Sequence, residues 1–284
     1  FRRLPHPVPD EIRPAGAGQS FPKRRDTLSL IRILSPVKNQ AERGTCSIFS
    51  STALLEAMLV INHLAAPGID LSEEWLQYLT TQETSEEGSE SPDNFKLLRT
   101  FGQPSESALP YGVEVWTSKR DGLPAKRCGH LKRGMALRSC LVSHRDPVLL
   151  KTGDHELLDP NSVNYDPEFK LARDEASRNR DAYLLSNSEK DGIVERVTEI
   201  QESLYRGIPL TLDIDFYYGA WNYETGDKYN IRTSPDLWNN GVITYPEKGS
   251  YDRAKRDGGG HSVLVVGYDT EREVSYYVSM KDGT

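Results

Sequence analysis

Apolar and polar positions alternate differently in the two ends of the chain. From residue 46 to residue 110, apolar side chains recur every three or four positions, which is typical of amphipathic α-helices. The strongest such pattern follows Cys46, where one apolar stripe is formed by Phe49, Ala53, Leu54, Ala57, Met58 and Ile61. We therefore predict a helical half over about residues 44–112.

The pattern changes to a β-rich half over about residues 182–284. We predict a short strand at 182–185 and then an amphipathic helix that ends near Gly207 and Pro209. The face of that helix is formed by Ile193, Val197, Ile200 and Leu204. Strict alternation from Ile208 to Phe216 predicts a half-buried strand. Further strands are predicted at residues 261–268 and 274–280.

Residues 113–181 lie between these halves and look like an insertion, because they are charged and weakly periodic. Within it, Lys119–Gly122 and Arg173–Arg180 are predicted to be solvated surface. At the other end, residues 1–20 are rich in Pro, Arg and Gly and predict an irregular extension, either a loosely attached terminus or the remnant of a pro-segment. The folded domain is predicted to span residues 21–284.

Composition narrows the classes of protein. A chain of 284 residues with 37% hydrophobic residues can form one large domain or two lobes. Its net charge of −7 argues against a nucleic-acid groove and against binding to an acidic membrane surface. No apolar run approaches the length of a membrane span.

Cys46 is the first candidate for chemistry. Gly44 and Thr45 interrupt regular structure just before the predicted helix, so Cys46 is expected in its first turn. The positive end of a helix favours a thiolate and lowers the pKa of a thiol. The alternative is a small buried structural cysteine.

The residues around Cys46 favour a nucleophile. Residues 36–40 read Pro-Val-Lys-Asn-Gln, five residues follow, and Cys46 then precedes Phe49-Ser50 and the helix. This segment resembles the active-site segment of papain-like cysteine peptidases. The resemblance implies that the oxyanion hole is formed by Gln40 and the backbone N–H of Cys46.

A second segment near the C-terminus fits the same family. Gly260-His261 opens an apolar run that ends in Gly267-Tyr268, which resembles the family's histidine segment. The resemblance implies that His261 is the base and forms an ion pair with Cys46, each shifting the other toward its charged form. Residues 71–76 and 101–112 also resemble family segments, in the same order. In the first of these, Ser72 can cap a helix, and Glu73 and Glu74 in its first turn suit the helix dipole.

Some positions depart from the family pattern. Arg43 stands where the family usually has a disulfide-forming cysteine, three residues before the nucleophile. Ser47 stands where the family has tryptophan. The family's Cys-x-Gly-Gly segment, which binds substrate, has its nearest candidate at Gly88.

The sequence leaves open which residue orients the histidine. The family uses an asparagine after the next strand, and here Lys281-Asp282-Gly283-Thr284 follows the predicted strand. Asp282 can replace the asparagine, because a carboxylate also holds an imidazole. Alternatively, Asp282-Gly283 is a tight hairpin turn, and the asparagine lies beyond Thr284.

Two further cysteines fall in the insertion. Cys128 and Cys140 are expected either to form a disulfide, which would indicate an oxidising compartment, or to remain free thiols. A third possibility is a zinc site with His130 and His144, although these intervals are not a familiar zinc pattern.

The resemblance implies an α+β fold in which a helical lobe faces a β-barrel-like lobe across an active-site cleft. It implies a thiol-dependent endopeptidase that takes polypeptide substrates, needs no cofactor and is open to inhibition by a pro-segment or an inhibitor protein in the cleft. Two alternatives remain: a papain-fold acyl transferase or deamidase, and a catalytically impaired binding protein. The compartment is not determined, with a secreted or other non-cytosolic one favoured.

Overall fold

A computed structural model of the chain describes residues 28–82, 84–151, 154–185, 197–217, 239–242 and 258–271. The chain divides into two compact units, one of residues 1–211 with 264–270 and one of residues 212–263 with 271–284. The predictions for the N-terminal extension, for the strand at 274–280 and for Asp282 lie outside the described residues. The predicted boundaries of the three segments stay a prediction.

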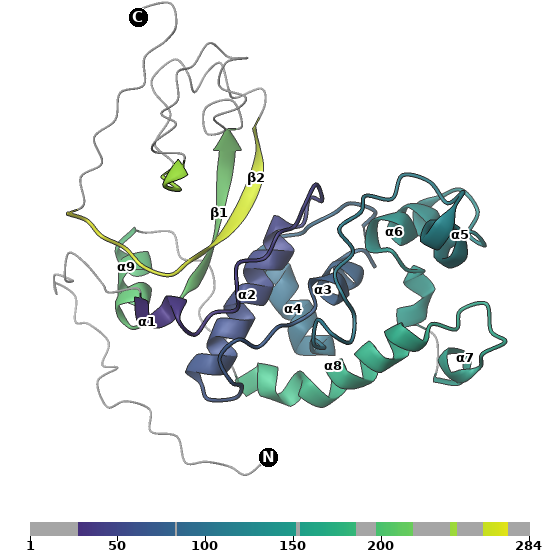
Figure 1. Cartoon of the computed structure of the whole chain (residues 1–284), viewed down its shortest axis with the longest axis horizontal. Coiled ribbons are helices and arrows are strands. Elements are labelled where there is room, and N and C mark those ends of the chain that lie inside the picture. The colour runs from purple at the N-terminus through teal and green to yellow at the C-terminus, as the bar shows by residue number, and fades with distance from the viewer. Residues whose placement is uncertain are drawn as a thin grey trace, which may run out of the picture. The chain divides into compact units, whose positions relative to one another are not determined.

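Helices dominate the part of the chain that the structure describes (Figure 1). In chain order the elements are α1 (Leu28–Ile31), α2 (Cys46–Ile61), α3 (Glu73–Thr80), α4 (Ser91–Phe101), α5 (Gly122–Cys128), α6 (Met135–Ser143), the 3-10 helix η1 (Pro147–Leu150), α7 (Asp154–Leu158), α8 (Pro167–Leu185), α9 (Val197–Tyr205), β1 (Leu210–Tyr217) and β2 (Gly258–Val265). The predicted helical region from residue 46 to residue 110 is thus confirmed as helical.

Helix α2 begins at Cys46, as predicted, but it is buried on more than one stripe. Ile48, Ser51 and Leu55 lie outside the predicted stripe and are buried, whereas Phe49 and Ala53 on that stripe are half-buried. The reason is that α3, α4 and α8 all pack against α2. A helix enclosed by neighbours buries several faces, and its small hydroxyl side chains permit the close approach.

Helix α3 begins as its sequence predicts. The Ser72 hydroxyl accepts a hydrogen bond from the backbone N–H of Trp75 at 3.1 Å, which is an N-cap. The Trp75 side chain is buried and donates from Nε1 to the carbonyl of Gly102 at 3.0 Å. Its ring also packs against Phe169 of α8, with centroids 5.3 Å apart. A second apolar cluster therefore joins α3 to α8.

Helix α8 corrects two predictions. The segment Arg173–Arg180 is not simply solvated surface, and residues 182–185 are the last turn of a helix, not a strand. One face of α8 is small and apolar, with Phe169, Ala172 and Ala176 all buried. Figure 1 shows α8 passing beneath α4, and the two helices contact each other. The many charges on its other faces hid this periodicity.

The end of α4 shows how closely α8 approaches. Gly102, the C-cap of α4, has a φ of 72°, and a Cβ there would lie 2.1 Å from the carbonyl oxygen of Ala176. Only glycine fits this position, because both the backbone conformation and the space exclude a side chain. Helix α8 is therefore tightly packed against α4 within the first unit.

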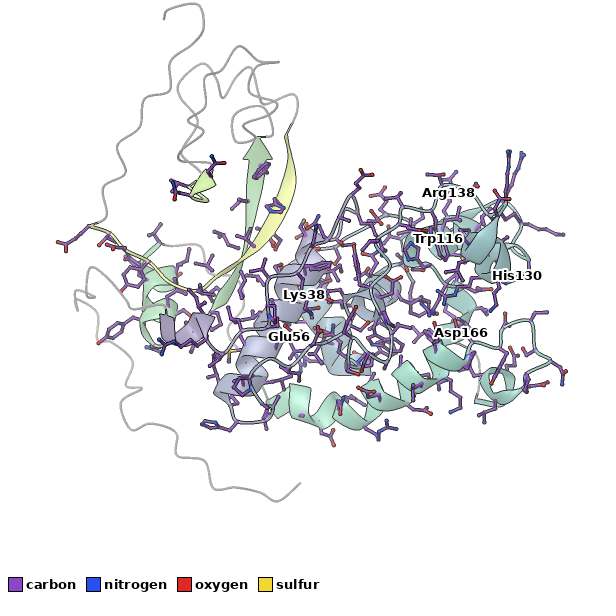
Figure 2. The ribbon with its side chains drawn as sticks, viewed as in Figure 1. Lys38, Glu56, Trp116, His130, Arg138 and Asp166 are labelled. Carbon is purple, nitrogen blue, oxygen red and sulfur yellow. A yellow bond between two sulfur atoms is a disulfide. The ribbon has the colours of Figure 1, made fainter. Side chains whose placement is uncertain are left out.

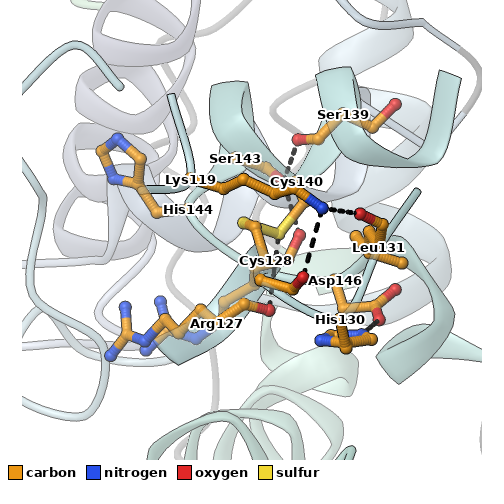
Figure 3. The surroundings of a disulfide bond; sticks show 12 residues. Lys119, Arg127, Cys128, His130, Leu131, Ser139, Cys140, Ser143, His144 and Asp146 are labelled. Carbon is orange, nitrogen blue, oxygen red and sulfur yellow. Dashed lines mark hydrogen bonds and ion pairs between the residues drawn. A yellow bond between two sulfur atoms is a disulfide. The ribbon is translucent and has the colours of Figure 1, made fainter. Parts of the chain in front are cut away.

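Cys128 and Cys140 form a disulfide, with Cα atoms 5.9 Å apart (Figure 3). Of the three alternatives for this pair, the disulfide is the one observed. The bond joins the end of α5 to α6, and both sulfurs are buried. Figure 3 also shows Lys119 reaching the carbonyl of Leu131. Lys119 donates to the carbonyl of Gly129 as well, at 3.2 Å, so it holds the chain around this bond.

The C-terminal part of the described chain contains α9 and the paired strands β1 and β2. Helix α9 ends before Gly207, as predicted, and buries Leu204. Along β1, Asp213 and Asp215 are exposed between half-buried neighbours, which confirms the predicted alternation from residue 212 to residue 216. Before it, Pro209 is buried and Thr211 is half-buried, so the alternation does not extend back to Ile208 as predicted. Within the described residues the sheet has these two strands, so the barrel-like form of the β lobe stays a prediction.

Candidate active site

Cys46 is the first residue of α2 and the free cysteine of this chain. The carbonyl of Thr45 accepts the first helical hydrogen bond, from Phe49 N–H at 3.0 Å. The N–H groups of the first turn, including that of Cys46, therefore have no acceptor within the helix. Cys46 is half-buried and lies at the positive end of α2.

A tight turn precedes Cys46 and positions Gln40. Ala41 has a φ of 55°, and its N–H donates to Asn39 Oδ1 at 2.8 Å. The Gln40 side chain folds back within the turn and donates from Nε2 to the carbonyl of Arg43 at 2.8 Å. An amide nitrogen carries two hydrogens, so a second N–H is left for another acceptor. We call residues 39–46 the nucleophile loop.

Tyr111 connects the two ends of the nucleophile loop. Its hydroxyl donates to the carbonyl of Gln40 at 3.1 Å and lies 2.7 Å from the hydroxyl of Thr45. Its ring meets Phe49 of α2 edge-on, with centroids 4.9 Å apart. Burial raises the pKa of Tyr111, so the hydroxyl stays neutral and can donate at physiological pH.

Arg43 occupies the interior of the same loop. The side chain is 1% exposed, although an unpaired arginine is almost never buried. Its guanidinium donates to Glu87 Oε1 at 2.8 Å, Glu74 Oε2 at 2.8 Å, the Gly112 carbonyl at 2.6 Å and the Val142 carbonyl at 2.8 Å. It also lies over the ring of Tyr111, 4.8 Å from the centroid.

The segment Glu87–Ser89 packs against the nucleophile loop from outside. Gly88 has a φ of 74°, and a Cβ there would lie 2.5 Å from the carbonyl oxygen of Gly44. The N–H of Ser89 donates to the hydroxyl of Ser47 at 3.0 Å. Ser47 therefore ties α2 to this segment.

A second, partly buried charge cluster lies just before the nucleophile loop, and Figure 2 labels two of its members, Lys38 and Glu56. Lys38 Nζ lies 3.1 Å from Glu56 of α2, 2.8 Å from Glu73 of α3 and 2.6 Å from Asp70. Burial raises the pKa of Glu73 to about 7, although the charge of Lys38 acts in the opposite direction. A protonated Glu73 thus becomes populated near neutral pH.

The neighbouring acid Glu74 behaves in the opposite way. Burial would raise the pKa of its carboxyl, but a hydrogen bond from His144 and the charge of Arg43 lower it below the ordinary value. His144 Nδ1 lies 2.9 Å from Glu74 Oε1, and its other nitrogen lies 2.9 Å from the Glu114 carbonyl. The Glu74 carboxylate therefore lies between the guanidinium of Arg43 and the ring of His144.

His261 lies in β2, in the second unit, and Cys46 and Gln40 lie in the first. Its ring is half-buried and meets Phe216 of β1 edge-on, with centroids 5.3 Å apart. Burial lowers the pKa of His261, which favours the neutral ring. Gln40 and Cys46 thus lie in one loop of the first unit, and their roles and the pairing of Cys46 with His261 stay predictions.

Among the described residues, no group of three or more His, Cys, Asp or Glu side chains is arranged to hold a metal ion. In the same stretches of chain, none of the helices combines the length and the apolar character that a membrane crossing requires.

Sequence reasoning missed the supporting residues Glu74, Glu87 and Tyr111, and it treated Arg43 only as a departure from a family pattern. Glu74 was interpreted as a partner of the helix dipole, but it is buried beside Arg43. No local pattern could reveal a pairing over 44 positions, such as that of Arg43 with Glu87. The one available signal was that Tyr111 lies in a family-like segment.

Comparison with known protein families identifies the class of protein to which the chain belongs. The sequence profile of the papain family of cysteine proteases matches residues 21–281. The chain therefore belongs to the papain family of cysteine proteases: it has the papain-like α+β fold and is a cysteine-type peptidase.

Two further comparisons add little to this. A similar solved structure is that of xylellain, a cysteine protease from Xylella fastidiosa, at 17% identity over 86% of this chain and 73% of that chain, with a TM-score of 0.45. We base no conclusion on a likeness of this degree. No curated protein matches the sequence significantly.

Proposed function

We propose that this peptidase is an endopeptidase that uses Cys46 as its nucleophile, His261 as its acid and base, and Gln40 with the Cys46 N–H as its oxyanion hole. The observation that carries the proposal is the free Cys46 at the first turn of α2, directly after a loop that orients the Gln40 amide. Family membership supports a polypeptide as the substrate.

The reaction follows from the chemistry of these groups. The Cys46 thiolate attacks the scissile carbonyl carbon, and the carbonyl oxygen gains the negative charge. Two N–H donors stabilise that charge, each worth a few kcal/mol in the transition state. The imidazolium of His261 protonates the leaving amine, and a thioester remains on Cys46. The neutral imidazole then takes a proton from water, which attacks the thioester and releases the acid.

His261 must alternate between two protonation states in this reaction. Burial lowers the pKa of its ring, so the imidazolium needs the Cys46 thiolate as a partner to be populated at neutral pH. Because a thiolate and an imidazolium stabilise each other, removal of either group should discharge the other. This mutual dependence gives the proposal a direct test.

The test measures the rate at which iodoacetamide alkylates Cys46, together with cleavage of an unfolded protein. We expect rapid alkylation that falls about tenfold or more in a His261→Ala variant, and cleavage that is lost in both His261→Ala and Cys46→Ser. A His63→Asn variant is the control, because His63 is exposed and has a φ of 55° that asparagine tolerates.

The outcomes separate the alternatives. Alkylation no faster than that of an ordinary thiol, unchanged by His261→Ala and without cleavage, would refute the proposal and favour a binding protein. Ligation of a peptide to an added amine, without hydrolysis, would favour an acyl transferase.

A further inference from the structure

We propose that Arg43 is a positioning residue for the catalytic groups, and that its buried ion pairs hold the nucleophile loop where papain-like peptidases usually have a disulfide. The inference rests on the proposed function of Cys46 and Gln40. It assigns a role to a side chain that does not itself touch the reacting atoms.

The side chain of Arg43 joins the nucleophile loop to four separate parts of the first unit. Its acceptors belong to α3, to the Glu87–Ser89 segment, to the backbone at Gly112 and to the end of α6. An arginine suits this task because its planar guanidinium directs five N–H donors in fixed directions. A lysine at this position would reach fewer of the acceptors.

The backbone carbonyl of Arg43 also forms a contact within the nucleophile loop. Its carbonyl accepts the hydrogen bond from Gln40 Nε2, so its position sets the orientation of the proposed oxyanion donor. A shift of Arg43 would move Gln40 by the same amount. The side chain and the carbonyl of one residue thus couple the protein interior to the Gln40 amide.

Glu87 extends the same coupling to Cys46. One carboxylate oxygen accepts from Arg43 Nε at 2.8 Å, and the other accepts from the N–H of Gly44 at 2.7 Å. Gly44 lies two positions before Cys46. The Arg43–Glu87 pair therefore fixes the chain immediately before the nucleophile, and it connects two segments 44 positions apart.

The guanidinium of Arg43 lies beside carboxylates of the opposite charge. Glu74 is 1% exposed and lies against both Arg43 and His144, which lower the pKa of its carboxyl against the effect of burial. An ionic anchor of this kind is insensitive to reducing agents, unlike a disulfide. It weakens in acid, because protonation of the carboxylates removes the charge that Arg43 binds.

The decisive variant is Glu87→Gln, because Glu87 is partly exposed, whereas Glu74 is buried. We expect a roughly tenfold or greater fall in the rate of Cys46 alkylation and in kcat, with KM and Tm little changed, because small misplacements of catalytic groups cost rate and not binding. The matched control is Glu90→Gln, an exposed acid whose side chain makes no capping hydrogen bond.

Arg43→Lys is the second variant. We expect it to keep one ion pair and to react at a rate between those of Glu87→Gln and wild type, with Tm lowered. The alkylation arm compares each variant with wild-type Cys46, so it gives an answer even if no peptide is cleaved. Wild-type alkylation rates in both Glu87→Gln and Arg43→Lys would overturn the positioning role, whatever the reaction that Cys46 performs.

Discussion

Breaking the Cys128–Cys140 disulfide tests how much this bond stabilises the fold around the α5–α6 pair, which contacts Arg43. Helix α6 ends close to Val142, whose carbonyl accepts a hydrogen bond from Arg43. His144, the C-cap of α6, lies against Glu74. The perturbation is a Cys128→Ala/Cys140→Ala double variant, or reduction of the wild-type bond.

The magnitude follows from the length of the closed loop. The two cysteines are 12 positions apart, and the chain-entropy treatment of a loop of this size gives about 3 kcal/mol of stabilisation. Both sulfurs are buried, so the double variant also loses packing. We therefore expect the free energy of unfolding to fall by about 3 kcal/mol or somewhat more.

The assay is urea denaturation followed by far-UV circular dichroism, in a Cys46→Ser background that removes the reactive thiol. With a slope of about 3 kcal/mol per molar urea, the midpoint should fall by about 1 M. Reducing agent should lower the midpoint of the disulfide-bonded protein and leave the double variant unchanged. Equal midpoints for the two proteins without reductant would refute the reasoning from loop closure.

Two further predictions concern a glycine and an acid. Gly88→Ala should slow Cys46 alkylation and lower the free energy of unfolding more than Gly68→Ala does. Both glycines have a positive φ, but only Gly88 faces a backbone oxygen, that of Gly44. Equal losses of stability in urea denaturation would contradict this. Glu73, whose pKa is raised to about 7, binds its proton more tightly in the folded state. The stability that this proton contributes is full below about pH 4.5 and is lost as pH rises through about 7. Wild type should therefore lose stability relative to Glu73→Gln over this range. Parallel curves of stability against pH for the two proteins would refute the raised pKa of Glu73.

Local patterns were sufficient for the elements whose periodicity is strong. The apolar spacing after Cys46 predicted α2 and its first residue, and the Ser72 cap predicted the start of α3. Alternation predicted β1. These features depend on neighbours within one or two turns of chain, which is the range that a sequence pattern records.

Patterns with a narrow apolar face were misleading. Helix α8 buries small side chains such as Ala172 and Ala176 among many charges, so its average character indicated a solvated surface. Its last turn, residues 182–185, is a short apolar run, and such a run does not distinguish a strand from a helix. Contact with α4, whose Gly102 admits the backbone of α8, decided the outcome.

The sequence by itself determined the family and indicated Cys46 and Gln40 as the candidate nucleophile and oxyanion-hole residue, because the motifs of the family are residue types at fixed spacing. Tertiary structure decided what holds the nucleophile loop. The pairing of Arg43 with Glu74 and Glu87 joins positions that are 31 and 44 residues apart, and opposite charges attract wherever folding brings them together. The buried surroundings then decided the pKa values of two adjacent acids. Burial raises the pKa of Glu73 despite the charge of Lys38, whereas His144 and Arg43 lower the pKa of Glu74.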